Sequence, residues 1–162
     1  MVTINKATLS SNVWETFYDR ILVDVTSVTL SDSTTRTVKT VTGSFPDKAV
    51  DSDKPTSDYP IIVINTPTIS WDGPPSFSLT KKKAMISINI EIYESKSESA
   101  ELLLDAVNES IETYRNSLKD LGLRFVKQDS TDSDEVFRGK IKLHIRRTTW
   151  TMEYIFTATR TY

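Results

Sequence analysis

Apolar and polar residues alternate without a break from Met85 to Glu94. A period of two places successive side chains on opposite faces of a strand. The pattern predicts a strand with one buried face and one polar face. The buried face carries Ile86, Ile88, Ile90 and Ile92, and the polar face carries Ser87, Asn89, Glu91 and Tyr93.

Three further segments have the character of strands. Tyr59–Asn65 is an almost wholly apolar run bounded by prolines, which is typical of a buried strand. Residues 136–147 and 150–160 alternate again, and we interpret them as a closing hairpin. Their apolar positions are Phe137, Ile141, Leu143 and Ile145 on the first strand, and Trp150, Met152, Tyr154 and Phe156 on the second.

Two segments show helical spacing instead. Residues 12–25 repeat apolar side chains every three or four positions, with Ser11 or Asn12 as the expected cap and Glu15 completing a capping box. Residues 97–121 form a longer amphipathic stripe, and Gly122 follows as the expected left-handed terminator. The stripe consists of Leu103, Val107, Ile111, Tyr114, Leu118 and Leu121.

The segments between these elements are polar. Residues 26–44 are rich in Ser and Thr and fit either a two-stranded ribbon or a flexible arm, and residues 44–58 indicate a loop. We interpret 26–58 as an extended arm or loop that contacts something. The acidic run Asp129–Glu135 indicates a solvated hairpin loop.

Together these elements predict one α+β domain spanning residues 1–162. Two helices with apolar stripes and one apolar sheet face favour a two-layer sandwich, with a mainly antiparallel sheet and both helices on one face. The other sheet face is expected to be polar. The 26–58 segment is a long arm or ribbon insertion in this plan.

Composition limits the function classes. A net charge of −2 provides no global field for gathering nucleic acid or acidic lipid. The absence of cysteine excludes disulfides, thiolate catalysis and Cys-ligated metals. No export signal or membrane-length apolar run is present, so we expect a soluble protein with no membrane partner.

Candidate chemistry is sparse. His144 is the only histidine, and no partner that could make it a general base or metal ligand is evident. The acidic run lacks the Gly of a calcium loop and is too short to form one. Phosphate-binding and nucleophile motifs are missing as well. We therefore expect no enzyme activity, no catalytic residues, no metal site and no cofactor.

The most regular polar pattern in the sequence is a row of basic residues at every second position. If residues 136–147 form one strand, every second residue lies on one face. The row is then either a solvated face paired with Glu153 and Glu91, or a track that contacts a phosphate backbone or an acidic partner subunit. We favour pairing or a protein contact. The candidate channel or subunit-contact residues are Arg138, Lys140, Lys142, His144 and Arg146, together with Lys81, Lys82 and Lys83, which read as a solvated turn or a loop edge in an assembly.

The order of elements resembles that of the tail terminator (tail completion) proteins of long-tailed bacteriophages. The resemblance rests on the Tyr59–Ile64 strand and on the long helix followed by the aromatic-rich hairpin. It implies a homo-oligomeric ring, commonly of six, that caps the tail tube, ends tube polymerisation and joins the tail to the head or neck. Its implied partners are further copies of itself, the tube protein and a head or neck completion protein.

The resemblance also implies a location in the virion tail after assembly in the host cytoplasm, with DNA only as passing cargo. Other classes stay open. A tail tube or other neck or connector subunit has the same fold class, and a non-viral binding module would be monomeric or dimeric. A small hydrolase is the remaining enzyme alternative, but it needs a nucleophile–base pair that the sequence does not show.

Overall fold

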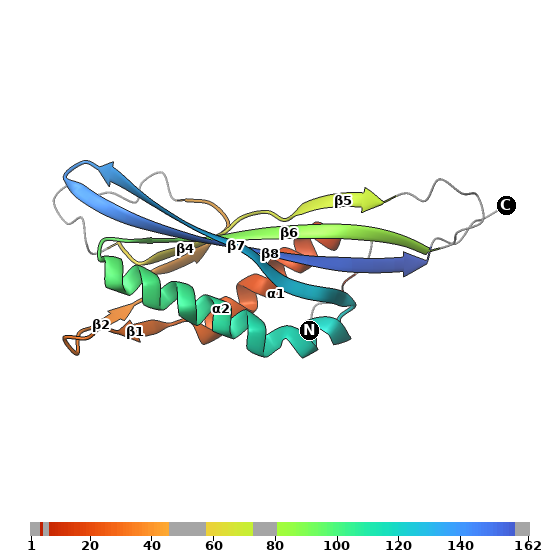
Figure 1. Ribbon diagram of the computed structural model, residues 1–162, viewed down its shortest axis with the longest axis horizontal. Helices are drawn as coiled ribbons and strands as arrows, with labels where there is room; N and C mark the ends of the chain where they lie inside the picture. The colour runs from red at the N-terminus through yellow and green to blue at the C-terminus, as the bar shows by residue number, and fades with distance from the viewer. Residues whose placement is uncertain (1–3, 5–6, 46–57, 73–80, 158–162) are drawn as a thin grey trace.

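The computed structural model describes residues 4, 7–45, 58–72 and 81–157 (Figure 1). Expectations for residues 46–57 and for the last five residues lie outside the described residues. Ten elements follow one another along the chain: α1 (Leu9–Asp24), β1 (Ser27–Thr29), β2 (Thr35–Thr37), β3 (Thr40–Thr42), β4 (Ile61–Ile64), β5 (Thr68–Asp72), β6 (Lys81–Glu94), α2 (Ser97–Asp120), β7 (Leu123–Arg138) and β8 (Ile141–Thr157).

The main sheet has the strand order β3-β4-β6-β8-β7, and β5 also pairs with β6. All these pairings are antiparallel except β3 with β4. The ladder between β6 and β8 runs from Lys81 opposite Thr157 to Glu94 opposite His144. This ladder is the centre of the sheet, because β4, β5 and β7 each pair with one of its two strands.

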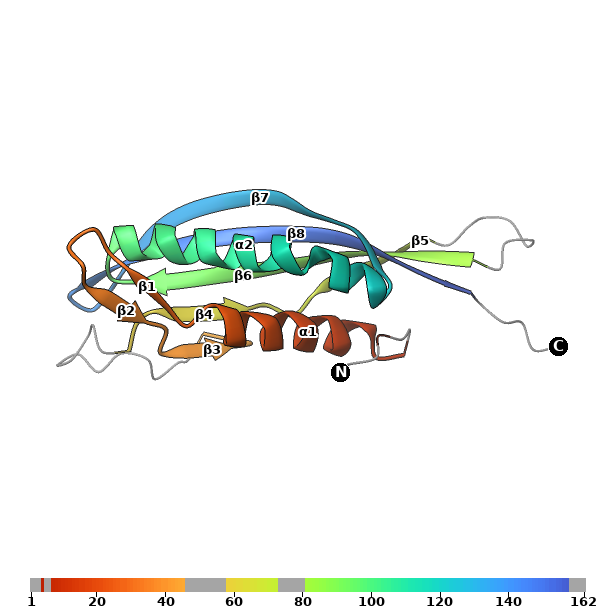
Figure 2. The ribbon, with the colours of Figure 1, turned by 90° about the horizontal axis from the view of Figure 1, so that it is seen from below.

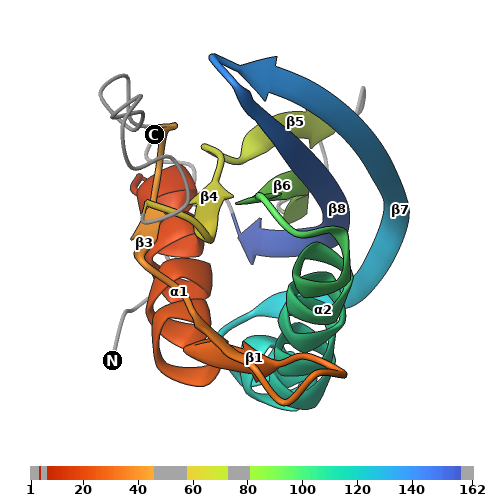
Figure 3. The same ribbon diagram turned by 90° about the vertical axis from the view of Figure 1, so that its left-hand side faces the viewer.

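Both helices lie on one side of the sheet (Figures 2 and 3). The structure therefore confirms a two-layer α+β sandwich with a mainly antiparallel sheet. The main core joins apolar residues of both helices to one side of β4, β6 and β8, here called the helix side. The sheet supplies Ile62, Ile64, Ala84, Ile86, Ile88, Ile90, Ile92, Trp150 and Met152 to this core.

The described part of the 26–58 segment forms a ribbon, one of the two alternatives. β1 and β2 form a small antiparallel hairpin, and β3 then joins the edge of the main sheet. The hairpin is docked rather than free, since Leu30 is buried and Ser31 donates backbone and side-chain hydrogen bonds to Glu98 at the start of α2. No extended arm exists over residues 26–45.

A buried ion pair fastens this ribbon to the sheet. Glu94 is fully buried at the end of β6, and Arg36 of β2 donates to both of its carboxylate oxygens at 2.7 and 3.2 Å. The Ser99 hydroxyl and the Ser95 backbone N–H also donate to Glu94, each at 2.7 Å. Arg36 further bonds the carbonyl of Tyr59. One carboxylate thus joins β2, β6 and the start of α2.

The helices are close to their predicted bounds. α2 and its terminator match the prediction, with Gly122 at φ +96°. α1 begins at Leu9, three residues before the predicted start, and the expected capping box is wrong. Thr8 takes the cap position without a side-chain cap bond, while Asn12 donates to the Thr8 hydroxyl within the first turn.

The closing hairpin differs from the prediction. β7 and β8 turn at Gly139 and Lys140, with Gly139 at φ +60°, so residues 136–147 are not one strand. The acidic run Asp129–Glu135 is part of β7 and not a loop. Asp and Ser are poor strand formers, but here they occupy a solvent-exposed edge strand paired only with β8.

β8 changes its buried side along its length. Trp150 and Met152 face the helices, whereas Ile141 and Leu143 join a second cluster on the opposite side of the sheet with Tyr59, Ile61 and Val63. The predicted single apolar face is therefore wrong for this strand. The face away from the helices is polar only in part.

We expect Arg36→Ala to destabilise the fold by about 3 kcal/mol, since it leaves a buried carboxylate without its charge partner. Chemical denaturation measures this change. The matched control is Arg115→Ala, which removes a solvent-exposed pair with Glu112 and should cost no more than about 1 kcal/mol. Equal losses in the two variants would contradict the assigned role of Arg36.

The same site predicts an acid-dependent stability. Burial alone raises the pKa of Glu94, but hydrogen bonds from Arg36, Ser99 and Ser95 outweigh it and hold the pKa below its ordinary value. A lowered folded-state pKa contributes stability that is present above the unfolded value of about 4.3 and is lost as the pH falls below it. The stability difference between wild type and Glu94→Gln should therefore be constant from pH 7 to 5 and shrink below about pH 4. A difference that grows on acidification would contradict this.

Candidate functional site

The predicted basic row is divided between three places. Arg138 ends β7, Lys140 lies in the turn, and Lys142, His144 and Arg146 lie on β8. The three β8 residues do share one face, the helix side, because His144 and Arg146 lie opposite Glu94 and Ile92 of β6. They do not form a continuous track with Arg138 or Lys140.

The basic side chains of β8 all have acidic partners within the chain. Lys142 and His144 both lie against Glu135, at 2.6 and 3.1 Å. The hydrogen bond from Lys142, followed by the charges of Lys142 and His144, lowers the pKa of Glu135. Arg146 is buried and pairs with Glu101 of α2. The prediction of paired charges holds, but with partners from β7 and α2 instead of Glu153 and Glu91.

The other basic candidates are also placed in the fold. Arg138 stacks over the ring of Phe45, with 4.1 Å from the guanidinium carbon to the ring centre. Lys81, Lys82 and Lys83 belong to β6 and not to a turn. Lys83 pairs with Glu153 at 3.2 Å. The charge of Lys83 is therefore matched by a carboxylate on the neighbouring strand.

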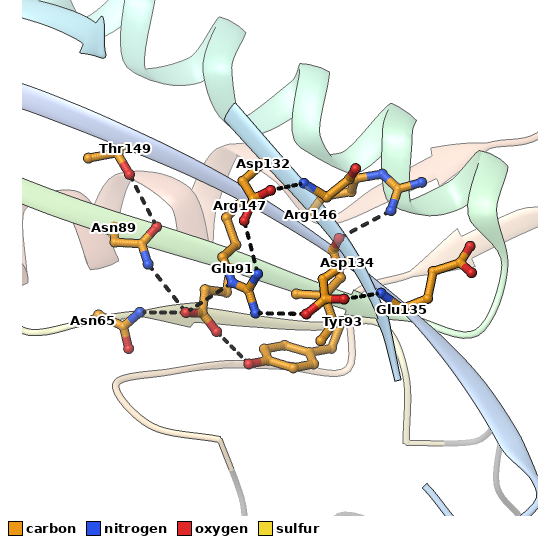
Figure 4. A network of polar contacts seen from close by, with 12 residues as sticks. Asn65, Asn89, Glu91, Tyr93, Asp132, Asp134, Glu135, Arg146, Arg147 and Thr149 are labelled. Carbon is orange, nitrogen blue, oxygen red and sulfur yellow. Dashed lines mark hydrogen bonds and ion pairs between the residues drawn. The ribbon is translucent and has the colours of Figure 1, made fainter. Parts of the chain in front are cut away.

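A polar network occupies the face of the sheet away from the helices (Figure 4). Glu91 of β6 is its centre, with a side chain that is 17% exposed. Asn65 and Asn89 donate to one carboxylate oxygen at 3.2 Å each, and the Tyr93 hydroxyl donates to the other. Burial, followed by the hydrogen bond to Glu91, raises the pKa of Tyr93.

Arg147 extends this network to the edge of the sheet. Its guanidinium lies 3.6 Å from Glu91, 3.2 Å from Asp132 and 3.8 Å from Asp134. One cation therefore ties β6, β8 and β7 together on this face. The sequence reasoning did not single out Arg147. The signal was present in the register, because Arg147 faces Asp132 once the acidic run is read as a strand.

Neutral hydroxyl and amide groups continue this surface along the sheet. We call the polar surface of β6 and β8 on the side away from the helices the open face. It consists of Ser87, Asn89, Glu91, Tyr93, Arg147, Thr149 and Thr151. These residues alternate with the core residues of β6 and β8 and lie opposite one another across the ladder. The open face is thus polar, with its one described cation surrounded by three carboxylates.

The chemistry available at this surface is limited. Within the described residues, no group of three or more Asp, Glu or His is placed to hold a metal ion. Two pockets of about 440 and 460 Å³ lie elsewhere, by the start of α1 and between α2 and β7. Neither is lined by a carboxylate or imidazole that could serve as a general base.

No protein-family model matches this chain, and no curated protein is significantly similar to it. Among the described helices, none has the length and apolar character needed to span a bilayer.

We expect Arg147→Ala to cost about 1–2 kcal/mol, less than a fully buried pair because its side chain is partly exposed. The variant leaves Glu91, Asp132 and Asp134 facing one another, so amide exchange should accelerate locally in β7. Denaturation and hydrogen exchange measure the two effects. Lys83→Ala, which removes one peripheral pair, is the control. Unchanged exchange in β7 would show that Arg147 does not hold this edge.

Proposed function

We propose that this protein is a structural subunit of a long-tailed bacteriophage, forming a ring that caps the tail tube, ends its polymerisation and joins the tail to the head or neck. The observation that carries the proposal is the open face. It is broad, polar and lacks a free cation among its described residues. Such a surface suits the wall of a channel through which DNA passes without being held.

The charges of the open face favour only weak contact with DNA. A surface that binds DNA presents unpaired Lys and Arg to phosphates, and each phosphate contact strengthens retention. Among the seven residues that define the open face, Arg147 is the one cation, and it lies among Glu91, Asp132 and Asp134, so phosphates over these residues meet a neutralised guanidinium. Hydroxyl and amide groups keep the wall hydrated. This supports passage of DNA rather than binding of it.

The rigid two-layer fold supports a structural role. The long ladder of β6 and β8 and the covering helices give a stiff subunit, and the docked β1–β2 hairpin contacts the start of α2. A closed ring needs two different surface patches that meet between neighbours. The described surface offers exposed apolar side chains on separate elements, among them Leu22 on α1 and Trp71 on β5.

Native mass spectrometry with negative-stain imaging of the purified protein tests this proposal. We expect a closed ring of fixed subunit number, with six as the expected count from the family resemblance. Filaments or open tubes would favour a tube subunit instead. A monomer or dimer that persists at high protein concentration would overturn the ring.

A further inference from the structure

A pocket lies between the C-terminal end of α2 and the start of β7, on the side of the sheet that carries the helices. Its volume of about 460 Å³ is in the range of ligand-binding pockets. No Asp or Glu lines it. Its lining combines three basic residues with three apolar ones: Arg115, Lys119, Arg124, Leu123, Phe125 and Val126.

Phe125 has an unusual backbone conformation at this pocket. Its φ is +52°, a left-handed value that is unfavourable for a bulky residue. It lies in the irregularity of the β7–β8 ladder between Arg124 and Lys127, where Val126 is buried in the core and Phe125 is 70% exposed. So exposed a ring buries little apolar area, and the free chain gains no burial there that offsets the strain. Backbone strain of this kind is concentrated at binding sites.

The cations of the pocket are only partly neutralised. Arg115 has an exposed acidic partner three residues earlier on α2, at 2.9 Å. Lys119 and Arg124 have no ion pair among the described residues. Glu153, which lies opposite Arg124 in the ladder, is bound to Lys83 instead. Two unpaired cations beside an apolar pocket complement a ligand that carries carboxylates next to an apolar group.

We propose that this pocket binds an acidic peptide segment of a partner protein. An apolar side chain of the segment lies against Phe125, and its carboxylates lie beside Lys119 and Arg124. The apolar contact buries the exposed ring and supplies the burial that the free chain lacks. Nucleic acid fits this pocket less well, because a phosphate backbone is held by a longer series of free cations.

The pocket is separate from the open face on which the proposed function depends. It lies on the helix side, which in the proposed ring is turned away from the channel. Binding of the peptide requires neither a ring nor a channel. A chain that binds the peptide but forms no ring keeps this contact and loses the proposed function. A ring that forms without binding the peptide loses only the contact.

Titration followed by ¹H–¹⁵N NMR tests the contact and locates it. The probe is the capped peptide Asp-Glu-Phe-Glu-Asp, added at millimolar concentration to the purified full chain. We expect saturable shifts of the backbone amides in residues 115–126, and we expect the same peptide with Lys in place of its acidic residues to give none. No saturable shifts in residues 115–126 with the acidic peptide, or tighter binding of a short oligothymidylate at the same amides, would overturn the proposal.

Phe125→Asn separates binding from folding. Asn adopts a positive φ more readily than Phe, so the variant should resist thermal denaturation at least as well as the wild type. Loss of the ring should weaken peptide binding about tenfold. Phe137→Asn removes an equally exposed ring at the other end of β7 and should bind the peptide like the wild type. Unchanged peptide binding by Phe125→Asn would contradict the assigned role of Phe125.

Lys119→Glu tests the charge complementarity. The acidic peptide should bind about fivefold or more weakly, since repulsion replaces attraction. The peptide with Lys in place of its acidic residues should bind this variant better than it binds the wild type. Lys39→Glu makes the same change in net charge at an exposed residue near β3 and is the matched control. Equal weakening in the two variants would show a general effect of net charge and would contradict recognition at the pocket.

Discussion

The structure depends on one constraint: β8 is longer than the helix layer that covers it. Where β8 lies against α2, Trp150 and Met152 face the helices. Beyond Arg146, which contacts Ser97 and Glu101 at the start of α2, neither described helix covers that side, and the hairpin projects past α2 (Figure 1). The buried side of the strand therefore changes. Its first residues pack on the other side, against the cluster of Tyr59, Ile61 and Val63.

The distribution of charge follows from this change of side. On the helix side, exposed Lys142 and mostly buried His144 meet Glu135 of β7. On the other side, Arg147 meets Glu91 and two aspartates. Acidic β7 and basic β8 thus neutralise each other across the hairpin. This pairing removes the basic track as a free surface and leaves a polar sheet face, which is the basis of the proposed role as a channel wall.

Much of the fold could be predicted from the sequence, because strong periodicity marks its interior. The apolar residues of β6 and of α2 each lie on a single face of their element, so the buried face is determined by the sequence. Gly122 has the positive φ expected of a residue that ends a helix. The closing hairpin was mispredicted for physical reasons. Gly139 is the turn residue, but the alternation continues across it, and acidic residues in β7 are poor strand formers that an exposed edge tolerates. The candidate site depended on that register, so Arg147 was missed while Lys142 and His144 were grouped with Arg138.

The central claim is that the open face lines the channel of an assembled ring. A cryo-electron microscopy map of the assembly tests it most directly. The account predicts that Ser87, Asn89, Thr149 and Thr151 face the central channel, with α1 and α2 turned away from it. A ring in which the helices line the channel and the open face is buried between subunits would contradict the account.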